Sequence, residues 1–140
     1  SEKNARALVD SFGFNSNFCF KLDNLIKFSP AYVGKYYDLT DKYYLWIRAS
    51  ADVFLTTTKS HSCLVVYLDS KKRLVKYRAD GTEKLKLIPN QWNKIVIEYL
   101  TPEVRHSDDK IVVYYWNIGD APVYVDNLKV EILEPKDENP

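Results

Sequence analysis

The stretch that decides the fold is YYWNIGDAPVYVDNLKVEIL, residues 114–133. It holds two runs rich in β-branched and aromatic residues, separated by the turn-forming sequence Gly119-Asp120-Ala121-Pro122. This pattern predicts two antiparallel strands joined by a short connection. Aromatic side chains occur on both faces of the first run, which is more aromatic surface than a core needs.

The second run contains an acid where alternation predicts a core position. Asp126 has the same parity as the apolar residues Leu128, Val130 and Ile132. A buried carboxylate must be hydrogen-bonded, paired with a cation or bound to a metal. One solution is a calcium ion bound by Asp126 and by oxygen donors near the start of the chain. Those donors would come from Asp10, Ser11, Asn15 and Asn17. The simpler solution is backbone N–H groups or a Lys or Arg partner, and it is favoured because no recognised calcium-loop motif occurs.

The same strand signals recur along the rest of the chain. Strand-like segments span 17–22, 31–37, 43–55, 62–68, 73–78, 84–88 and 92–100. Turn-forming residues separate them, and a helical turn is expected only near 1–7. Many short strands with few helix signals predict an all-β protein, and we expect a two-sheet antiparallel jelly-roll β-sandwich. We expect one domain over residues 1–134 and a polar tail or linker over 135–140.

Alternation assigns each long strand one apolar face and one mixed face. The apolar faces predict a core of Leu45, Ile47, Val53, Val65, Ile95, Ile97, Ile111, Val113, Leu128, Val130 and Ile132. The opposite faces mix aromatic, charged and small polar side chains. Such faces are too polar for a core and unusually aromatic for a surface exposed to water.

The mixed faces provide the candidate binding residues. A sugar ring offers an apolar face to Trp or Tyr and a rim of hydroxyl groups to charged or polar side chains. If their strands are neighbours, both kinds of contact would come from Tyr44, Trp46, Arg48, Glu98, Tyr114 and Trp116. The alternative is that these aromatic residues cover sheet edges or lie under long loops, because Tyr and Trp also favour strands for packing reasons.

Composition and motifs argue against other classes of function. The net charge is +1, which gives no general attraction to nucleic acid or to an anionic membrane. The basic stretch 71–78 is interpreted as a solvated edge hairpin, and no apolar run approaches the ~20 residues that span a bilayer. Cys19 and Cys63 lack zinc-site spacing and are either one disulfide or two thiols. No nucleophile motif accompanies the Ser, His and Asp residues of 105–109, so we expect no enzymatic activity.

The last third of the chain resembles a known family. VYVDNLKVEI, residues 123–132, resembles the closing strand of jelly-roll carbohydrate-binding modules. Residues 110–130 resemble the last strand pair of galactose-binding-like domains of bacterial envelope proteins, and QWNKIVIEY, residues 91–99, is similar to another of their strands. The resemblance implies a non-catalytic role, an extracytoplasmic location and a structural calcium near Asp126.

The sequence therefore predicts a non-catalytic module that binds carbohydrate, a polysaccharide or another glycan, on an aromatic-lined sheet face. Rings would stack on Trp46 and Trp116, and the other candidates would supply hydrogen bonds. The alternative is a structural or protein-interaction domain of a larger cell-envelope protein, whose aromatic face packs on a neighbouring domain. Both hypotheses need alternate side chains to project from opposite sides of a two-layered scaffold.

Overall fold

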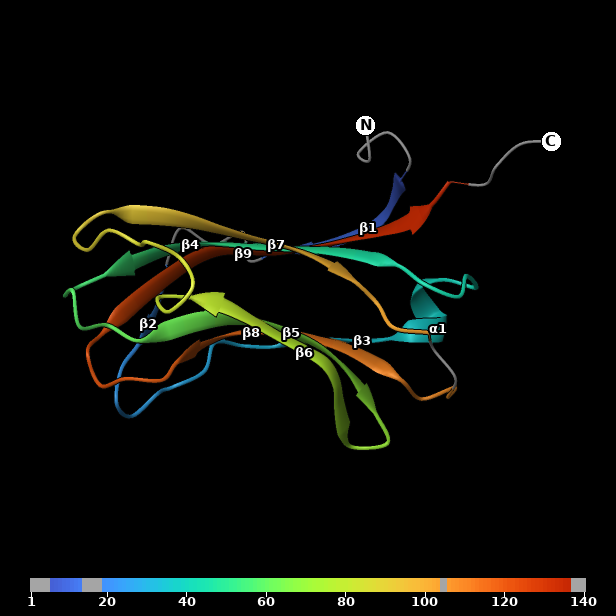
Figure 1. Ribbon diagram of the computed structural model, residues 1–140, viewed down its shortest axis with the longest axis horizontal. Helices are drawn as coiled ribbons and strands as arrows, with labels where there is room; N and C mark the ends of the chain where they lie inside the picture. The colour runs from blue at the N-terminus through green and yellow to red at the C-terminus, as the bar shows by residue number, and fades with distance from the viewer. Residues whose placement is uncertain (1–5, 14–18, 104–105, 137–140) are drawn as a thin grey trace.

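The computed structural model describes residues 6–13, 19–103 and 106–136, and it consists of two stacked antiparallel sheets (Figure 1). The five-stranded sheet has the order β1 (Arg6–Gly13), β9 (Val123–Pro135), β4 (Trp46–Leu55) and β7 (Trp92–Leu100), with β2 (Phe20–Leu22) also paired to β9. The four-stranded sheet has the order β3 (Tyr32–Lys35), β8 (Lys110–Asn117), β5 (Ser62–Ser70) and β6 (Arg73–Gly81). The expected all-β, two-sheet antiparallel sandwich is confirmed.

The core lies between the inner faces of the two sheets. Alternate residues of β4 and β7 are fully buried there, among them Ile47, Val53 and Ile97. Ten of the eleven predicted core residues belong to this cluster. The exception is Val65, which has no exposed surface but faces the other side of β5 from its core neighbours Leu64 and Val66.

Several expected element boundaries are wrong because tertiary contacts override local propensity. The expected strand at 31–37 ends at Lys35 and continues as the short helix α1 (Tyr36–Leu39). Tyr36 is fully buried in the core, and its hydroxyl donates to the backbone oxygen of Lys42 at 2.9 Å. The expected strand at 84–88 is instead a turn and loop, begun by backbone hydrogen bonds to the oxygen of Gly81.

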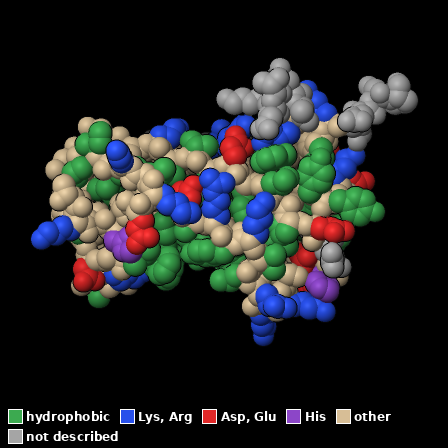
Figure 2. Space-filling model, in the orientation of Figure 1, with side chains coloured by type: hydrophobic (Ala, Val, Ile, Leu, Met, Phe, Trp, Pro, Cys, Tyr) green, Lys and Arg blue, Asp and Glu red, His purple; other side chains and the backbone are tan. Residues whose placement is uncertain are grey.

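The two ends of the chain also differ from expectation. Arg6 and Ala7, placed in a helical turn by the sequence analysis, belong to strand β1, and residues 1–5 lie outside the described residues. Strand β9 runs to Pro135, one residue into the expected tail. The basic stretch 71–78 forms the edge hairpin of the four-stranded sheet, and its Lys and Arg side chains gather at the projecting turn (Figure 2).

A β-bulge in β9 corrects the expected position of Asp126. Opposite the single residue Ala51 of β4, strand β9 carries two residues, Asn127 and Leu128. Asn127 has φ 51°, a left-handed backbone conformation that asparagine tolerates better than most residues. The extra residue reverses the alternation, so Leu128 enters the core while Asp126 stays half-buried outside it. The expected buried carboxylate is therefore not part of the core.

Candidate functional site

The sandwich separates the predicted binding residues onto two opposite surfaces. Trp46 and Arg48 lie on β4, and Glu98 lies opposite Arg48 on the neighbouring strand β7. Tyr114 and Trp116 lie on β8, which belongs to the other sheet. The strands are therefore not neighbours, and the two tryptophans do not share one groove. Tyr44 is 42% exposed in the segment leading into β4, near the Trp46 end of the five-stranded sheet.

Trp46 and its charged neighbours form an ionic cluster, defined here as Arg6, Arg48, Glu98 and Glu131. Glu98 accepts hydrogen bonds from Nε of Arg48 and Nη1 of Arg6, each at 3.0 Å. Nη1 of Arg48 lies 3.8 Å from Oε1 of Glu131. The guanidinium carbon of Arg6 is 4.5 Å from the ring centroid of Trp46, so it covers one face of the indole. That face is closed to a stacking ligand.

The ion pairs make Glu98 a stable carboxylate. Partial burial raises the pKa of Glu98, but the hydrogen bonds from Arg48 and Arg6 outweigh burial and leave the pKa below its ordinary value of 4.5. A general acid needs the opposite shift, because it must still carry its proton near neutral pH. The geometry of the ionic cluster therefore suits hydrogen bonding to a ligand and cohesion of the four strands β1, β4, β7 and β9.

We expect the ionic cluster to make stability depend on pH. Because the folded-state pKa of Glu98 is lowered, its contribution is present above the unfolded value of 4.5 and is lost as the pH falls through the folded value. Urea denaturation should show Glu98→Gln less stable than the wild type at about pH 6.5, and the difference should shrink towards about pH 3. Asp120→Asn is the control, because that side chain is 92% exposed and its ion pair with Lys27, at 3.4 Å, is screened by solvent. A difference that is constant with pH would contradict the assigned role.

An aromatic row lies at the other end of the same outer face. It consists of Trp92 of β7, Phe54 of β4 and Tyr124 of β9, which the register places side by side across three strands. The centroid of Phe54 is 5.6 Å from that of Trp92 and 6.2 Å from that of Tyr124, both in edge-to-face geometry. Trp92 is 49% exposed. The sequence analysis missed this row, although Phe54 has the parity of Trp46, and Trp92 has that of Glu98.

A polar row lies next to the aromatic row. It contains Asp52, Lys94 and Asp126, paired across β4, β7 and β9, together with the bulged Asn127. The side-chain amide of Asn127 donates to Asp52 Oδ2 at 2.7 Å, and its backbone N–H donates to Asp126 Oδ1 at 2.8 Å. Lys94 Nζ is 3.8 Å from Asp52 Oδ1. These side chains are positioned by one another and remain accessible to a ligand.

The polar row also bears on the calcium hypothesis. Asp126 accepts a backbone N–H, which is the simpler of the two solutions considered from sequence. Within the part of the chain that the structure describes, no three His, Cys, Asp or Glu residues are grouped as a metal site. Asn15 and Asn17 lie outside the described residues, and the side chains of Asp10 and Ser11 are not described. Calcium binding at Asp126 stays a prediction.

The outer surface of the four-stranded sheet carries a ring-rich face, defined as Phe28, Tyr67, Tyr77, Tyr114 and Trp116. Phe28 stacks on Trp116 at 5.8 Å, and Tyr67 stacks on Tyr77 at 5.9 Å. Tyr114 lies between these pairs, edge-to-face with Phe28 and Tyr67. Burial raises the pKa of Tyr114 to about 12, so its hydroxyl stays protonated. These rings largely pack on one another and shield the outer side of their sheet.

The two cysteines are separate thiols. Cys19 is exposed, and Cys63 is buried beneath the outer surface of the four-stranded sheet. Burial raises the pKa of the Cys63 thiol to about 11, which disfavours the reactive thiolate at neutral pH. Of the two alternatives left open by the sequence, the structure has two free thiols.

Comparisons with known proteins bear on the fold. No family model matches the chain, and no curated protein matches it. Among solved structures, the CBM22-1 and GH10 modules of Clostridium thermocellum endo-1,4-beta-D-xylanase 10B, complexed with xylohexaose, match 97% of this chain with 14% identity and a TM-score of 0.50. The match spans 26% of that chain. The CBM22-1 xylan-binding domain of Paenibacillus barcinonensis Xyn10C matches 94% of this chain and 98% of its own, with 12% identity and a TM-score of 0.47.

The likeness to the clostridial protein shows the fold of this chain. The chain is a β-sandwich of the kind found in carbohydrate-binding modules. No helix among the residues that the structure describes is both long and apolar enough to cross a bilayer.

Proposed function

We propose that this chain is a non-catalytic carbohydrate-binding module whose ligand lies along the outer face of β7, β4 and β9. One observation carries the proposal: the aromatic row occupies one end of this face, and hydrogen-bonding side chains of the polar row and the ionic cluster extend from it towards Trp46. Aromatic planes suit the apolar faces of sugar rings, and carboxylates, amides and cations suit their hydroxyl groups. This order of side chains fits a ligand with many similar units.

The length of the face suits a linear polysaccharide. Trp46 and Phe54 are eight residues apart on β4, or ~26 Å at about 3.3 Å per residue. In the proposed complex, the aromatic row stacks on one sugar, and the polar row donates and accepts hydrogen bonds at its neighbour. The ionic cluster and Tyr44 would contact units further along the chain. Because strand pairing already holds these groups in place, little conformational entropy is lost on binding.

The state of the acids supports a non-catalytic role. Glycoside hydrolysis needs two carboxylic groups that flank the scissile bond, one of them able to hold a proton near neutral pH. On this face, Glu98 is held ionised by Arg6 and Arg48, and Glu131 lies beside Arg48. Such paired carboxylates are suited to binding.

The names of the structural neighbours suggest which polysaccharides to test first. One neighbour is described as a complex with xylohexaose and the other as a xylan-binding domain. We therefore include xylan at the head of the ligand panel. A module that binds such polymers would act outside the cytoplasm, so an extracytoplasmic location is part of the proposal.

The test is binding of the isolated chain to a panel of polysaccharides, measured by affinity electrophoresis and by titration of tryptophan fluorescence. For any polymer that binds, an oligosaccharide of the same linkage is then titrated in two-dimensional ¹⁵N NMR. We expect the shifted amides to lie in β4, β7 and β9. Absence of binding across the panel would overturn the function, and shifts confined to β5, β6 and β8 would move the ligand to the other sheet.

The ring-rich face favours a second candidate function. Its five side chains carry no charge, and Phe28 and Tyr77 are 53% and 42% exposed. Such a surface also suits packing against a neighbouring domain in a larger envelope protein. In that case, Trp116 would be less accessible to acrylamide quenching in a longer natural chain than in these 140 residues, while Trp92 would stay accessible. Equal quenching of Trp116 in both would reject this candidate.

A further inference from the structure

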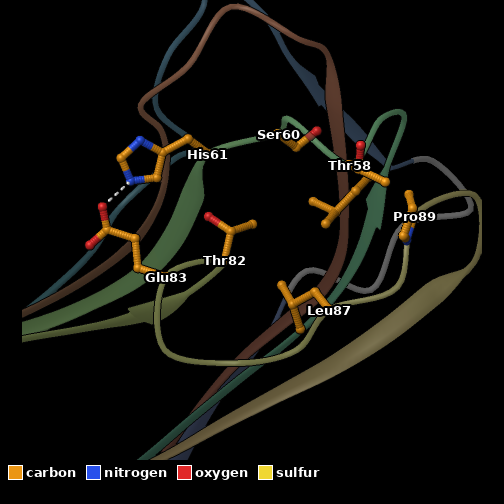
Figure 3. Close-up of a pocket in the computed structure, with 8 residues that line it drawn as sticks. Thr58, Ser60, His61, Thr82, Glu83, Leu87 and Pro89 are labelled. Atoms are coloured by element: carbon orange, nitrogen blue, oxygen red, sulfur yellow. Dashed lines mark ion pairs between the residues drawn. The ribbon is translucent and has the colours of Figure 1, made fainter.

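A cavity of about 290 Å³ opens at one end of the sandwich, away from both outer faces. It lies where β4 ends, β5 begins and β6 passes into the loop towards β7. Its lining residues are Leu55, Thr58, Ser60, His61, Thr82, Glu83, Leu87 and Pro89. Figure 3 shows the His61–Glu83 pair on one side of the opening and Leu87 and Pro89 on the other. The cavity thus has a polar wall and an apolar wall.

Backbone hydrogen bonds hold these walls in place. The oxygen of His61 accepts the N–H groups of Ile118 at 2.8 Å and of Gly119 at 2.9 Å. The N–H of Asn90 donates to the oxygen of Leu55 at 2.8 Å and ties the β6–β7 loop to the end of β4. The side chain of Thr82 is fixed against the backbone of Ser62, whose N–H it accepts at 3.1 Å. The cavity is therefore preformed.

The polar wall contains a buried group whose hydrogen-bonding capacity is unused. Ser60 is only 7% exposed, and its hydroxyl has no hydrogen-bond partner among the described residues. Leaving a buried hydroxyl unpaired costs stability, and such groups often mark a place where another molecule supplies the partner. Beside it, His61 Nε2 lies 2.9 Å from Glu83 Oε1, with 39% and 77% of their side chains exposed. The pair can offer both a donor and an acceptor to a ligand.

We propose that this cavity is a second ligand site, which binds one uncharged pyranose unit at the end of a glycan chain. Hydroxyl groups of the ligand would bind Glu83 and the hydroxyl of Ser60, which reaches the opening by rotation of its side chain. The C–H face of the ring would rest on Leu55, Leu87 and Pro89. The volume is large enough for one sugar ring. None of the eight lining residues is Lys or Arg, so an anionic ligand is disfavoured.

This inference rests on the proposed ligand class but uses a different part of the molecule. The outer face would bind the glycan along its length, and the cavity would bind a chain end or a single-unit side branch. A glycan that reaches both would gain affinity from linkage of the two sites.

The experiment titrates the ¹⁵N-labelled chain with the methyl pyranosides of xylose, glucose, galactose and mannose. With at least one of them, we expect saturable shifts of the amides at 58–61 and 82–88. Ser60→Ala should weaken that binding at least fivefold without lowering the melting temperature, because it removes an unpaired buried hydroxyl. Glu83→Gln should weaken it by a similar factor. Ser107→Ala, an exposed serine outside the cavity, is the matched control and should change nothing.

The outcomes separate the two proposals. If polysaccharides bind but no pyranoside shifts the cavity amides, the cavity site is wrong and the proposed function stands. If a pyranoside binds the cavity but no polysaccharide binds, the cavity site stands and the sheet-face function is wrong. Unchanged pyranoside affinity in both Ser60→Ala and Glu83→Gln would also overturn the cavity site.

Discussion

Trp92→Ala is expected to remove most of the affinity for a polysaccharide. Trp92 is the most exposed ring of the aromatic row. The next outward-facing pair of residues along β4 and β7 is Asp52 and Lys94, which belong to the polar row. Truncating an aromatic residue that is a hot spot of a binding surface costs about 2 kcal/mol or more. We therefore expect the dissociation constant to rise about thirtyfold. Affinity electrophoresis in gels that contain the polymer measures this loss directly.

Trp116→Ala is the matched control for this prediction. It removes the same ring from the opposite sheet, where Trp116 stacks on Phe28. We expect some loss of stability and little change in affinity. Circular dichroism establishes that both variants are folded before their affinities are compared. Retained binding in Trp92→Ala together with lost binding in Trp116→Ala would contradict the proposal. The ligand would then lie on the four-stranded sheet.

Gly81→Ala is expected to be the most destabilising conservative change in the four-stranded sheet. A Cβ atom at Gly81 would lie 2.0 Å from the backbone oxygen of Ser62 and 2.6 Å from Cα of Cys63. Those atoms belong to the paired strand β5 and cannot move without breaking the register of Cys63 with Gly81. Overpacking costs typically 1–3 kcal/mol, and a clash with backbone belongs at the upper end. We expect about 3 kcal/mol by urea denaturation, or roughly 10 °C in melting temperature.

Gly34→Ala provides the contrast. A Cβ atom there would lie 2.4 Å from the hydroxyl oxygen of Tyr32, a partly buried side chain packed against the core, so the clash involves a side chain and no backbone atom of a paired strand. We expect this substitution to cost less than Gly81→Ala, because only a side chain must shift and no strand pairing is broken. Equal losses for the two glycines would show that the clash at Gly81 is relieved by movement of the strands.

Much of the fold could be predicted from local patterns. Alternation in β4, β7 and β8 correctly divided inner from outer residues, because each of these strands has one face against the core. The same reasoning placed Trp46, Arg48 and Glu98 on an outer surface. It also identified the edge hairpin at 71–78 from its Lys and Arg residues.

What could not be predicted depends on pairing between distant strands. Nothing in residues 110–117 indicates that β8 pairs with β5 and β3 instead of β4, so Trp46 and Trp116 were expected together. The aromatic row needed the register of three strands, since Phe54, Trp92 and Tyr124 are far apart in sequence. The cavity with Ser60 is formed by loops, whose conformations follow from contacts with the ends of several strands.

The extra residue at Asn127 has a consequence for how strand β9 tolerates change. Tyr124 has an even number and Glu131 an odd one, yet both project to the outer side of the five-stranded sheet, because the bulge lies between them. Removing one residue there would restore simple alternation and turn one half of the strand inside out, driving either Tyr124 or Glu131 into the hydrophobic interior. Natural variants of this chain should therefore conserve the length of this segment more strictly than the identity of its exposed side chains.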